Sequence, residues 1–155
     1  MLQFLDSLSS NFMKITDNLY SYIWQGAGNN SNSYLIAGET LTLIDPGMVI
    51  DEMRENCLSL LLHDLEQDGF KADNIDLIIN PHTHPDHSLA NTPLIEMSQA
   101  KLAYHRKEHP DIEQIFRGFM GKDPDFKADF YLTDGELELG VNKRIKLQVL
   151  HTPGH

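Results

Sequence analysis

The spacing of apolar and polar positions changes period several times along the chain, and each change marks a new element. Short β-type runs alternate with longer segments in which apolar residues recur every three or four positions. The pattern predicts strands over residues 19–24, 33–37, 40–44, 75–79, 101–104, 130–132, 136–139 and 145–150. It predicts helices over residues 49–67, 88–98 and 111–120. Strands that alternate with helices indicate an α/β layered fold, in which helices cover a sheet.

Turn-forming residues separate these segments. Residues 26–31 form a loop rich in Gly and Asn, and Asp45-Pro46-Gly47 ends the second strand of a predicted hairpin. Gly69 follows the first helix at a position typical of a C-cap. In the last helix we expect four side chains to face the core, namely Ile112, Ile115, Phe116 and Phe119.

The sequence contains no internal repeat and no linker that would separate two domains. We therefore expect one domain over residues 12–155. An N-terminal extension over residues 1–11 precedes it, either as a short amphipathic helix or as a loose segment.

The composition argues against several classes of binding partner and of structural site. Among 155 residues, 12 Lys and Arg stand against 23 Asp and Glu, for a formal net charge of −11, which disfavours binding to the nucleic-acid backbone. Cys57 is the single cysteine, so an intrachain disulfide and a Cys-rich zinc module are excluded. We see neither a membrane-length apolar run nor the basic start of a secretory signal. We expect a cytoplasmic protein that binds a small-molecule substrate, and no nucleic acid or membrane.

Three of the eight histidines fall within the segment His82-Thr83-His84-Pro85-Asp86-His87. This segment follows a predicted buried strand, so we expect an extended loop at the strand's C-terminal end, where α/β folds place their sites. In an extended chain, His82 and His84 point the same way and converge on one metal ion. Asp86 and His87 diverge and reach a second position beside it. Imidazoles with one carboxylate suit zinc or iron.

A second motif, Thr152-Pro153-Gly154-His155, follows the last predicted strand, and its Pro-Gly turn would present His155 from the strand end. With His82 and His84, His155 would complete a three-histidine site with an open position for water, as in catalytic zinc sites. Asp45 either supports a ligand imidazole or the loop backbone, or forms a simple turn before Pro46.

These motifs resemble those of the metallo-β-lactamase superfamily. Residues 82–87 match its H-x-H-x-D-H signature, and residues 150–155 are similar to its downstream ligand segment. Residues 32–36 and 43–47 resemble its opening strands, with Asp45 at the position of the aspartate that supports the metal loop.

The resemblance implies an αββα sandwich and a hydrolase that uses a metal-activated hydroxide. It implies that His82, His84 and His155 bind a first metal ion. Asp86 and His87 would bind a second ion. Asp86 would also be catalytic, as the group that orients the hydroxide, or as the general base if only one metal ion binds. The resemblance implies zinc, one ion or two, and iron or manganese accept the same ligands.

The bridging aspartate and final histidine of the superfamily lie beyond the third motif, and the chain has no residues there. We therefore expect the first half of the sandwich, truncated after His155 and poorly active as written. A missing C-terminal segment or a second copy of the chain would complete it. Ser88-Leu89-Ala90 stands where the family usually has glycines, which leaves the subfamily open.

The leading hypothesis for function is a glyoxalase II-like hydrolase of a small ester, thioester or similar substrate. Two alternatives stay open: a persulfide-dioxygenase-like enzyme with one iron, and a metal-binding fragment without turnover. The absence of an export signal disfavours a β-lactamase, and the acidic charge disfavours a nuclease. We expect structural roles for His105 and His109, and for His151 at most a contact that supports the ligand segment.

Overall fold

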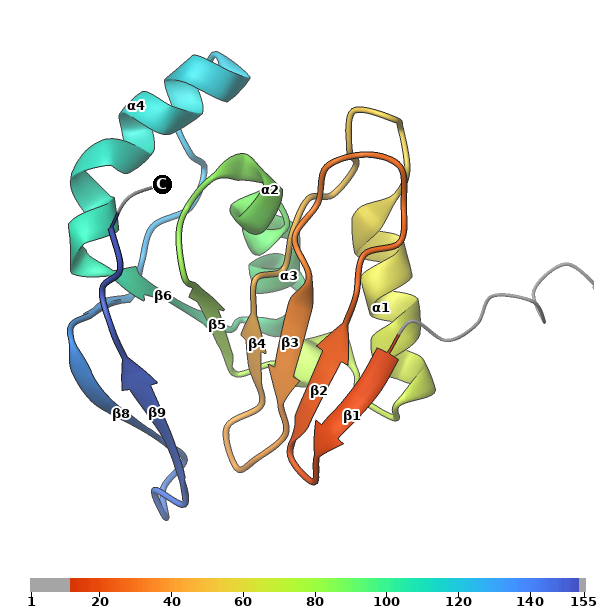
Figure 1. Ribbon diagram of the computed structural model, residues 1–155, viewed down its shortest axis with the longest axis vertical. Coiled ribbons are helices and arrows are strands. Elements are labelled where there is room, and N and C mark those ends of the chain that lie inside the picture. Colours follow the sequence, from red (N-terminus) through yellow and green to blue (C-terminus); the bar gives the residue numbers. More distant parts are fainter. Residues whose placement is uncertain (1–11, 154–155) are drawn as a thin grey trace, which may run out of the picture.

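The computed structural model describes residues 12–153. At its centre is a seven-stranded sheet whose strands lie in chain order from β1 to β7. β1 (Phe12–Thr16), β2 (Leu19–Tyr22), β3 (Ser33–Ile36) and β4 (Thr42–Ile44) pair in antiparallel fashion. β5 (Leu77–Asn80), β6 (Lys101–His105) and β7 (Phe130–Leu132) continue from β4 in parallel. β8 (Gly135–Leu139) and β9 (Ile145–Val149) form a separate antiparallel pair (Figure 1). The predicted extension over residues 1–11 lies outside the described residues.

Helices cover one face of the sheet, as the α/β prediction required. These are α1 (Cys57–Gln67), α3 (Asn91–Ser98) and α4 (His109–Met120). Successive strand residues point to opposite faces, so Leu35, Leu43 and Ile78 pack toward these helices and are fully buried. The predicted α/β fold is confirmed.

The opposite face of the sheet packs against β8 and β9. Leu77 and Ile79 flank Ile78 on β5 and turn to this side, where they join Leu139 in a second, smaller core. The central strands are therefore apolar on both faces, which explains why residues 75–79 form a continuous apolar run in the sequence.

Parallel pairing also aligns the carboxyl ends of β4, β5 and β6. Ile44 pairs with Ile79, and Asn80 pairs with Tyr104 one step later. The residues that follow these strands therefore gather at one edge of the sheet, the edge at which α/β folds place ligands.

Two predicted helices have different bounds. The helix predicted from residue 49 begins only at Cys57, because the Asn56 side chain accepts the Ser59 N–H as an N-cap and Arg54, at φ 65°, interrupts the helical path. The helix predicted over residues 88–98 is α3 preceded by a separate turn, α2 (Pro85–Ser88). Pro93 has no N–H to donate to a preceding turn, so it is suited to the first turn of a helix.

The remaining differences are small. β1 was not predicted, and two short 3₁₀ helices, η1 (Ala72–Asn74) and η2 (Arg106–Glu108), lie before β5 and α4. Phe119 is 72% exposed and does not face the core, whereas Ile112 and Phe116 are buried as expected. In the described part of the chain, no helix combines the length and the apolar character needed to cross a membrane.

The packing of the helix-covered face can be tested at Leu35, which is fully buried. We expect Leu35→Ala to lower the free energy of unfolding by about 3 kcal/mol, because the lost burial and the cavity both destabilise the fold. Leu60 on α1 is 43% exposed, so Leu60→Ala is the matched control, with an effect of less than about 1 kcal/mol. Urea unfolding monitored by circular dichroism gives both values, and equal losses would contradict the assignment of Leu35 to the core.

Candidate metal centre

The histidine motif begins as a loop after β5 and ends in the helical turn α2. The prediction of an extended segment through His87 is therefore wrong from Pro85 onward. His84 is extended, as a residue before proline prefers, and Pro85 begins the turn with its preset φ. The Ser88 hydroxyl closes the turn by donating to the carbonyls of Thr83, at 3.1 Å, and His84, at 2.9 Å. Asp86 and His87 consequently project from a helical turn.

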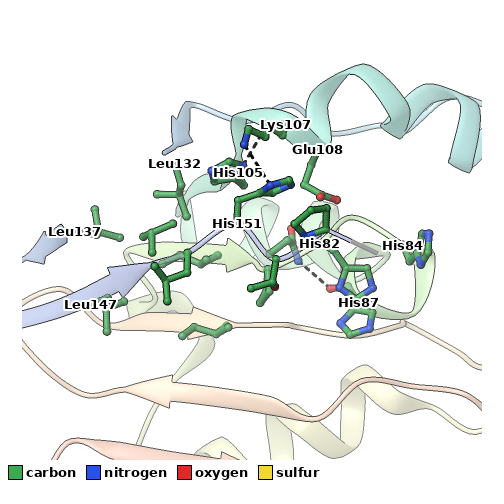
Figure 2. A pocket seen from close by; sticks show the side chains of 18 of the residues that line it. His82, His84, His87, His105, Lys107, Glu108, Leu132, Leu137, Leu147 and His151 are labelled. Carbon is green, nitrogen blue, oxygen red and sulfur yellow. Dashed lines mark hydrogen bonds between the residues drawn. The ribbon is translucent and has the colours of Figure 1, made fainter. Parts of the chain in front are cut away.

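Three imidazoles of the motif gather beside the end of β5 (Figure 2). The ring centroids of His82 and His84 are 5.0 Å apart with planes at 80°, and those of His82 and His87 are 3.8 Å apart. Two imidazoles bound to one zinc ion have centroids about 5 Å apart, given zinc–nitrogen bonds of about 2.1 Å. The His82–His84 separation therefore fits a shared ion.

Asp45, directly after β4, connects this strand to the motif. Its Oδ1 lies 3.0 Å from Nδ1 of His87, and its own N–H donates to the carbonyl of Ile79 at 3.0 Å. Asp45 has a φ of 54°, in the left-handed region that aspartate tolerates better than most residues. The Ser33 hydroxyl donates to its carbonyl at 2.5 Å and helps to hold this conformation.

The pKa values of Asp45 and His87 are both shifted from their ordinary values. Burial raises the pKa of Asp45 above its ordinary value, and the hydrogen bond from His87 opposes that shift. Burial works to lower the pKa of His87, but the hydrogen bond and charge of Asp45, with the charge of Asp86, raise it above its ordinary value. In the neutral ring, Nδ1 carries the proton toward Asp45 and Nε2 keeps a lone pair.

That lone pair faces another acceptor. Nε2 of His87 lies 3.5 Å from Oδ2 of Asp86, which also accepts the side-chain amide of Asn29 at 3.3 Å. An imidazole lone pair and a carboxylate at this separation repel unless a proton or a metal cation lies between them. Two ligands of a tetrahedral zinc ion are about 3.4 Å apart, so the pair fits a common ion.

Among the described residues, the candidate metal ligands come together two at a time, as His82 with His84 and as Asp86 with His87. Within residues 12–153, no three His, Cys, Asp or Glu side chains converge closely enough to hold one ion. His155, the expected third ligand beside His82 and His84, lies outside the described residues. The structure thus describes four of the five predicted ligands and brings them to one edge of the sheet.

The histidines line a cleft of about 850 Å³ together with residues from outside the segment 82–87. At its other side the cleft is lined by apolar side chains from β7, β8 and β9, Leu132, Leu137, Leu147 and Val149. His105, Lys107 and His151 also line it, and Phe119 places its ring 5.9 Å from that of His84. His151 belongs to the segment 150–155 that the sequence singles out, whereas no local pattern marks Lys107 or the apolar residues, which reach the cleft only through the fold.

The structure is an α/β fold with a histidine-lined cleft at the carboxyl edge of its sheet, and the comparison with known families identifies the family. Residues 26–155 match the sequence profile of the metallo-beta-lactamase superfamily. The chain belongs to this superfamily.

Relatives agree with this assignment. The probable metallo-hydrolase MJ0888 of Methanocaldococcus jannaschii is 35% identical over 135 residues, which are 84% of this chain and 60% of that protein. A hydroxyacylglutathione hydrolase of Polaromonas sp. is 30% identical over 137 residues, 86% of this chain and 42% of that protein. The chain thus spans about half the length of these curated relatives.

The fold also matches solved structures. BJP-1, a subclass B3 metallo-beta-lactamase of Bradyrhizobium japonicum, superimposes with a TM-score of 0.74 at 24% identity. The match covers 94% of this chain and 53% of that one. At this identity the likeness establishes the fold alone.

The Asp45–His87 hydrogen bond predicts a change in titration. In protein treated with chelator, we expect Asp45→Asn to lower the pKa of His87, because the carboxylate that raises it is lost and burial remains. Histidine ring resonances followed by NMR across pH give the value. Asp73→Asn, an exposed aspartate on η1, should leave it unchanged.

The same pair affects stability with a defined sign. A raised pKa in the folded state adds stability that is full below the unfolded value of about 6.5 and is lost as pH rises through the folded pKa. Asp45→Asn should therefore reduce the loss of stability over this window. An unchanged pKa of His87 in Asp45→Asn would show that another group sets it.

Proposed function

We propose that this chain forms the metal-binding part of a hydrolase that acts on a small ester or thioester. The observation that carries the proposal is the pair of acceptors, Nε2 of His87 and Oδ2 of Asp86, held 3.5 Å apart beside two further imidazoles. Such a donor set suits zinc, and membership of a superfamily whose named relatives are hydrolases supports turnover. The names of the hydroxyacylglutathione hydrolases favour an acyl substrate.

Each ligand has a role in the proposal. His82 and His84, with His155, would hold a first ion, and Asp86 with His87 would hold a second. A bound zinc ion supplies positive charge that makes water acidic near neutral pH and stabilises charge on the substrate's carbonyl oxygen. Asp45 keeps Nε2 of His87 available as a ligand by accepting a hydrogen bond from Nδ1–H.

Asp86 is the group proposed to move the proton. Its carboxylate is half-buried and accepts from the Asn29 amide, which fixes its orientation at the cleft. With only the first ion bound, Asp86 is free to act as general base: it accepts a proton from water as the water oxygen bonds to the acyl carbon, the acyl–sulfur or acyl–oxygen bond breaks, and the proton passes to the leaving thiolate or alkoxide. The products are a carboxylic acid and a thiol or alcohol.

Metal content tests the site directly. We expect His84→Ala to reduce bound metal to below about half of the wild-type content, because one of the few nitrogen ligands is lost. Elemental analysis of purified protein measures the content and identifies zinc, iron or manganese. His63→Ala is the matched control, since His63 is exposed on α1 far from the motif in sequence, and it should retain the metal. Full metal content in His84→Ala would assign the ion to other residues.

Turnover tests the proposed role of Asp86. We expect metal-loaded protein to hydrolyse simple thioesters slowly, because this chain alone is expected to be poorly active. Asp86→Asn should lower kcat/KM further by about 10²- to 10⁴-fold, the usual contribution of a positioned base. A thiol-detecting dye measures the rate, and Asp73→Asn controls for loss of a surface charge. Zinc binding with no hydrolysis of any thioester, lactone or phosphodiester, even in a chain extended beyond His155, would instead support metal binding without turnover.

A further inference from the structure

A basic cluster lies in the cleft between the histidine motif and the apolar wall (Figure 2). We define it as His105 at the end of β6, Lys107 on η2, and His151 after β9. The rings of His105 and His151 stack with centroids 4.8 Å apart and planes at 18°. Nζ of Lys107 lies 3.3 Å from Nδ1 of His151. Neither the metal ligands nor the proposed base belongs to this cluster.

The hydrogen bonds of the cluster direct its donors. Lysine ammonium only donates, so Nδ1 of His151 accepts from Lys107, and the proton of the neutral His151 ring is on Nε2. Nδ1 of His105 accepts the backbone N–H of Lys107 at 3.3 Å, which places the proton of the neutral His105 ring on Nε2 as well. The cluster therefore offers the Lys107 ammonium and two imidazole N–H groups.

One of these donors is buried without an acceptor. His105 is 7% exposed, and within the described part of the chain its Nε2 makes no hydrogen bond, since the nearest carboxylate oxygen, Oδ1 of Asp134, is 3.9 Å away. That oxygen already accepts the N–H of His151. A buried donor left without an acceptor is costly, so a ligand atom that accepts from it would be stabilised.

The charge of the cluster indicates which kind of anionic group it can bind. Lys107 is the only Lys or Arg among the described residues that line the cleft, and in the described part of the chain it makes no ion pair with a carboxylate. Asp134 and Glu108 lie near the cluster and limit its positive potential. The single positive charge of Lys107, with the imidazole N–H donors, suits a carboxylate, which carries one charge, better than a phosphate dianion.

We infer that the basic cluster of His105, Lys107 and His151 binds a carboxylate group of the substrate, so that the substrate class is an ester or thioester that carries a free carboxylate. This inference rests on the proposed hydrolase function, because it assigns the part of the substrate remote from the bond that is broken. The carboxylate would anchor one end of the molecule while the acyl group lies beside His82 and Asp86 in the same cleft.

Binding of succinate tests the cluster without turnover. We expect succinate to shift the ring resonances of His105 and His151 saturably in NMR titrations, whereas succinamide does not. The shifts should weaken about tenfold in affinity in Lys107→Met and persist in Lys107→Arg. Lys122→Met, at an exposed lysine outside the cleft, is the matched control.

Two further titrations test whether succinate binds to the cluster or to a metal ion, and whether the site prefers a carboxylate. The titration is repeated after chelator treatment, and succinate bound to a metal ion alone would lose its effect. Inorganic phosphate is titrated in parallel, and binding tighter than that of succinate would overturn the assignment to a carboxylate. Shifts that are absent, or equal in wild type and Lys107→Met, would overturn the site itself.

Turnover then separates this inference from the proposed function. The substrates are S-acetyl-3-mercaptopropanoate and its neutral amide. We expect Lys107→Met to reduce the ratio of kcat/KM for the acid over the amide about tenfold, mainly through KM for the acid. Hydrolysis with an unchanged ratio would overturn the carboxylate site and leave the hydrolase function standing. Hydrolysis of neither substrate, together with Lys107-dependent succinate binding, would overturn the hydrolase function and support the site.

Discussion

The hydrogen bond between Asp45 and His87 is the interaction on which the arrangement of the site depends. It joins the end of β4 to the turn α2 across 42 residues of sequence, and it holds a half-buried imidazole in one orientation. The left-handed backbone of Asp45 costs about 1 kcal/mol, and the hydrogen bonds to its N–H and carbonyl offset this cost. Without the carboxylate, Nδ1 of His87 would lack its acceptor, and the ring would no longer be held with Nε2 toward Asp86.

This interaction is possible because β4 and β5 run parallel with their ends level. Strands apolar on both faces can pair in parallel only when both faces are covered, and here helices cover one face and the β8–β9 pair covers the other. The fold therefore does more than bury surface. It aligns two strand ends so that a short side chain at one and a helical turn after the other come within hydrogen-bond distance.

Features encoded by neighbouring residues were predictable from the sequence, whereas features made by tertiary contacts were not. The strand pattern, the end of α1 near Gly69 and the histidine motif are each local, and the predicted fold class is confirmed. β1 was missed because Met13 and Ile15 are exposed on an edge strand, so no buried alternation marks it. The turn α2 was missed because a proline after an extended histidine is compatible with both a loop and a helix start. The basic cluster joins residues 44 positions apart, and no spacing rule relates Lys107 to His151.

The net negative charge of the chain makes the position of Lys107 in the cleft important for binding an anion. A net charge of −11 repels anions at long range, but salt screens this repulsion beyond about 10 Å at 0.1 M ionic strength. Inside a cleft that is apolar on one side, a single ammonium is screened less and acts over the length of a small substrate. Overall charge and local charge therefore have separate effects, the first on the rate of approach and the second on orientation. An acidic protein can accept an acidic substrate when its positive groups, here Lys107 and the proposed metal ion, are concentrated within the cleft. The distance between them then determines which molecules can contact both.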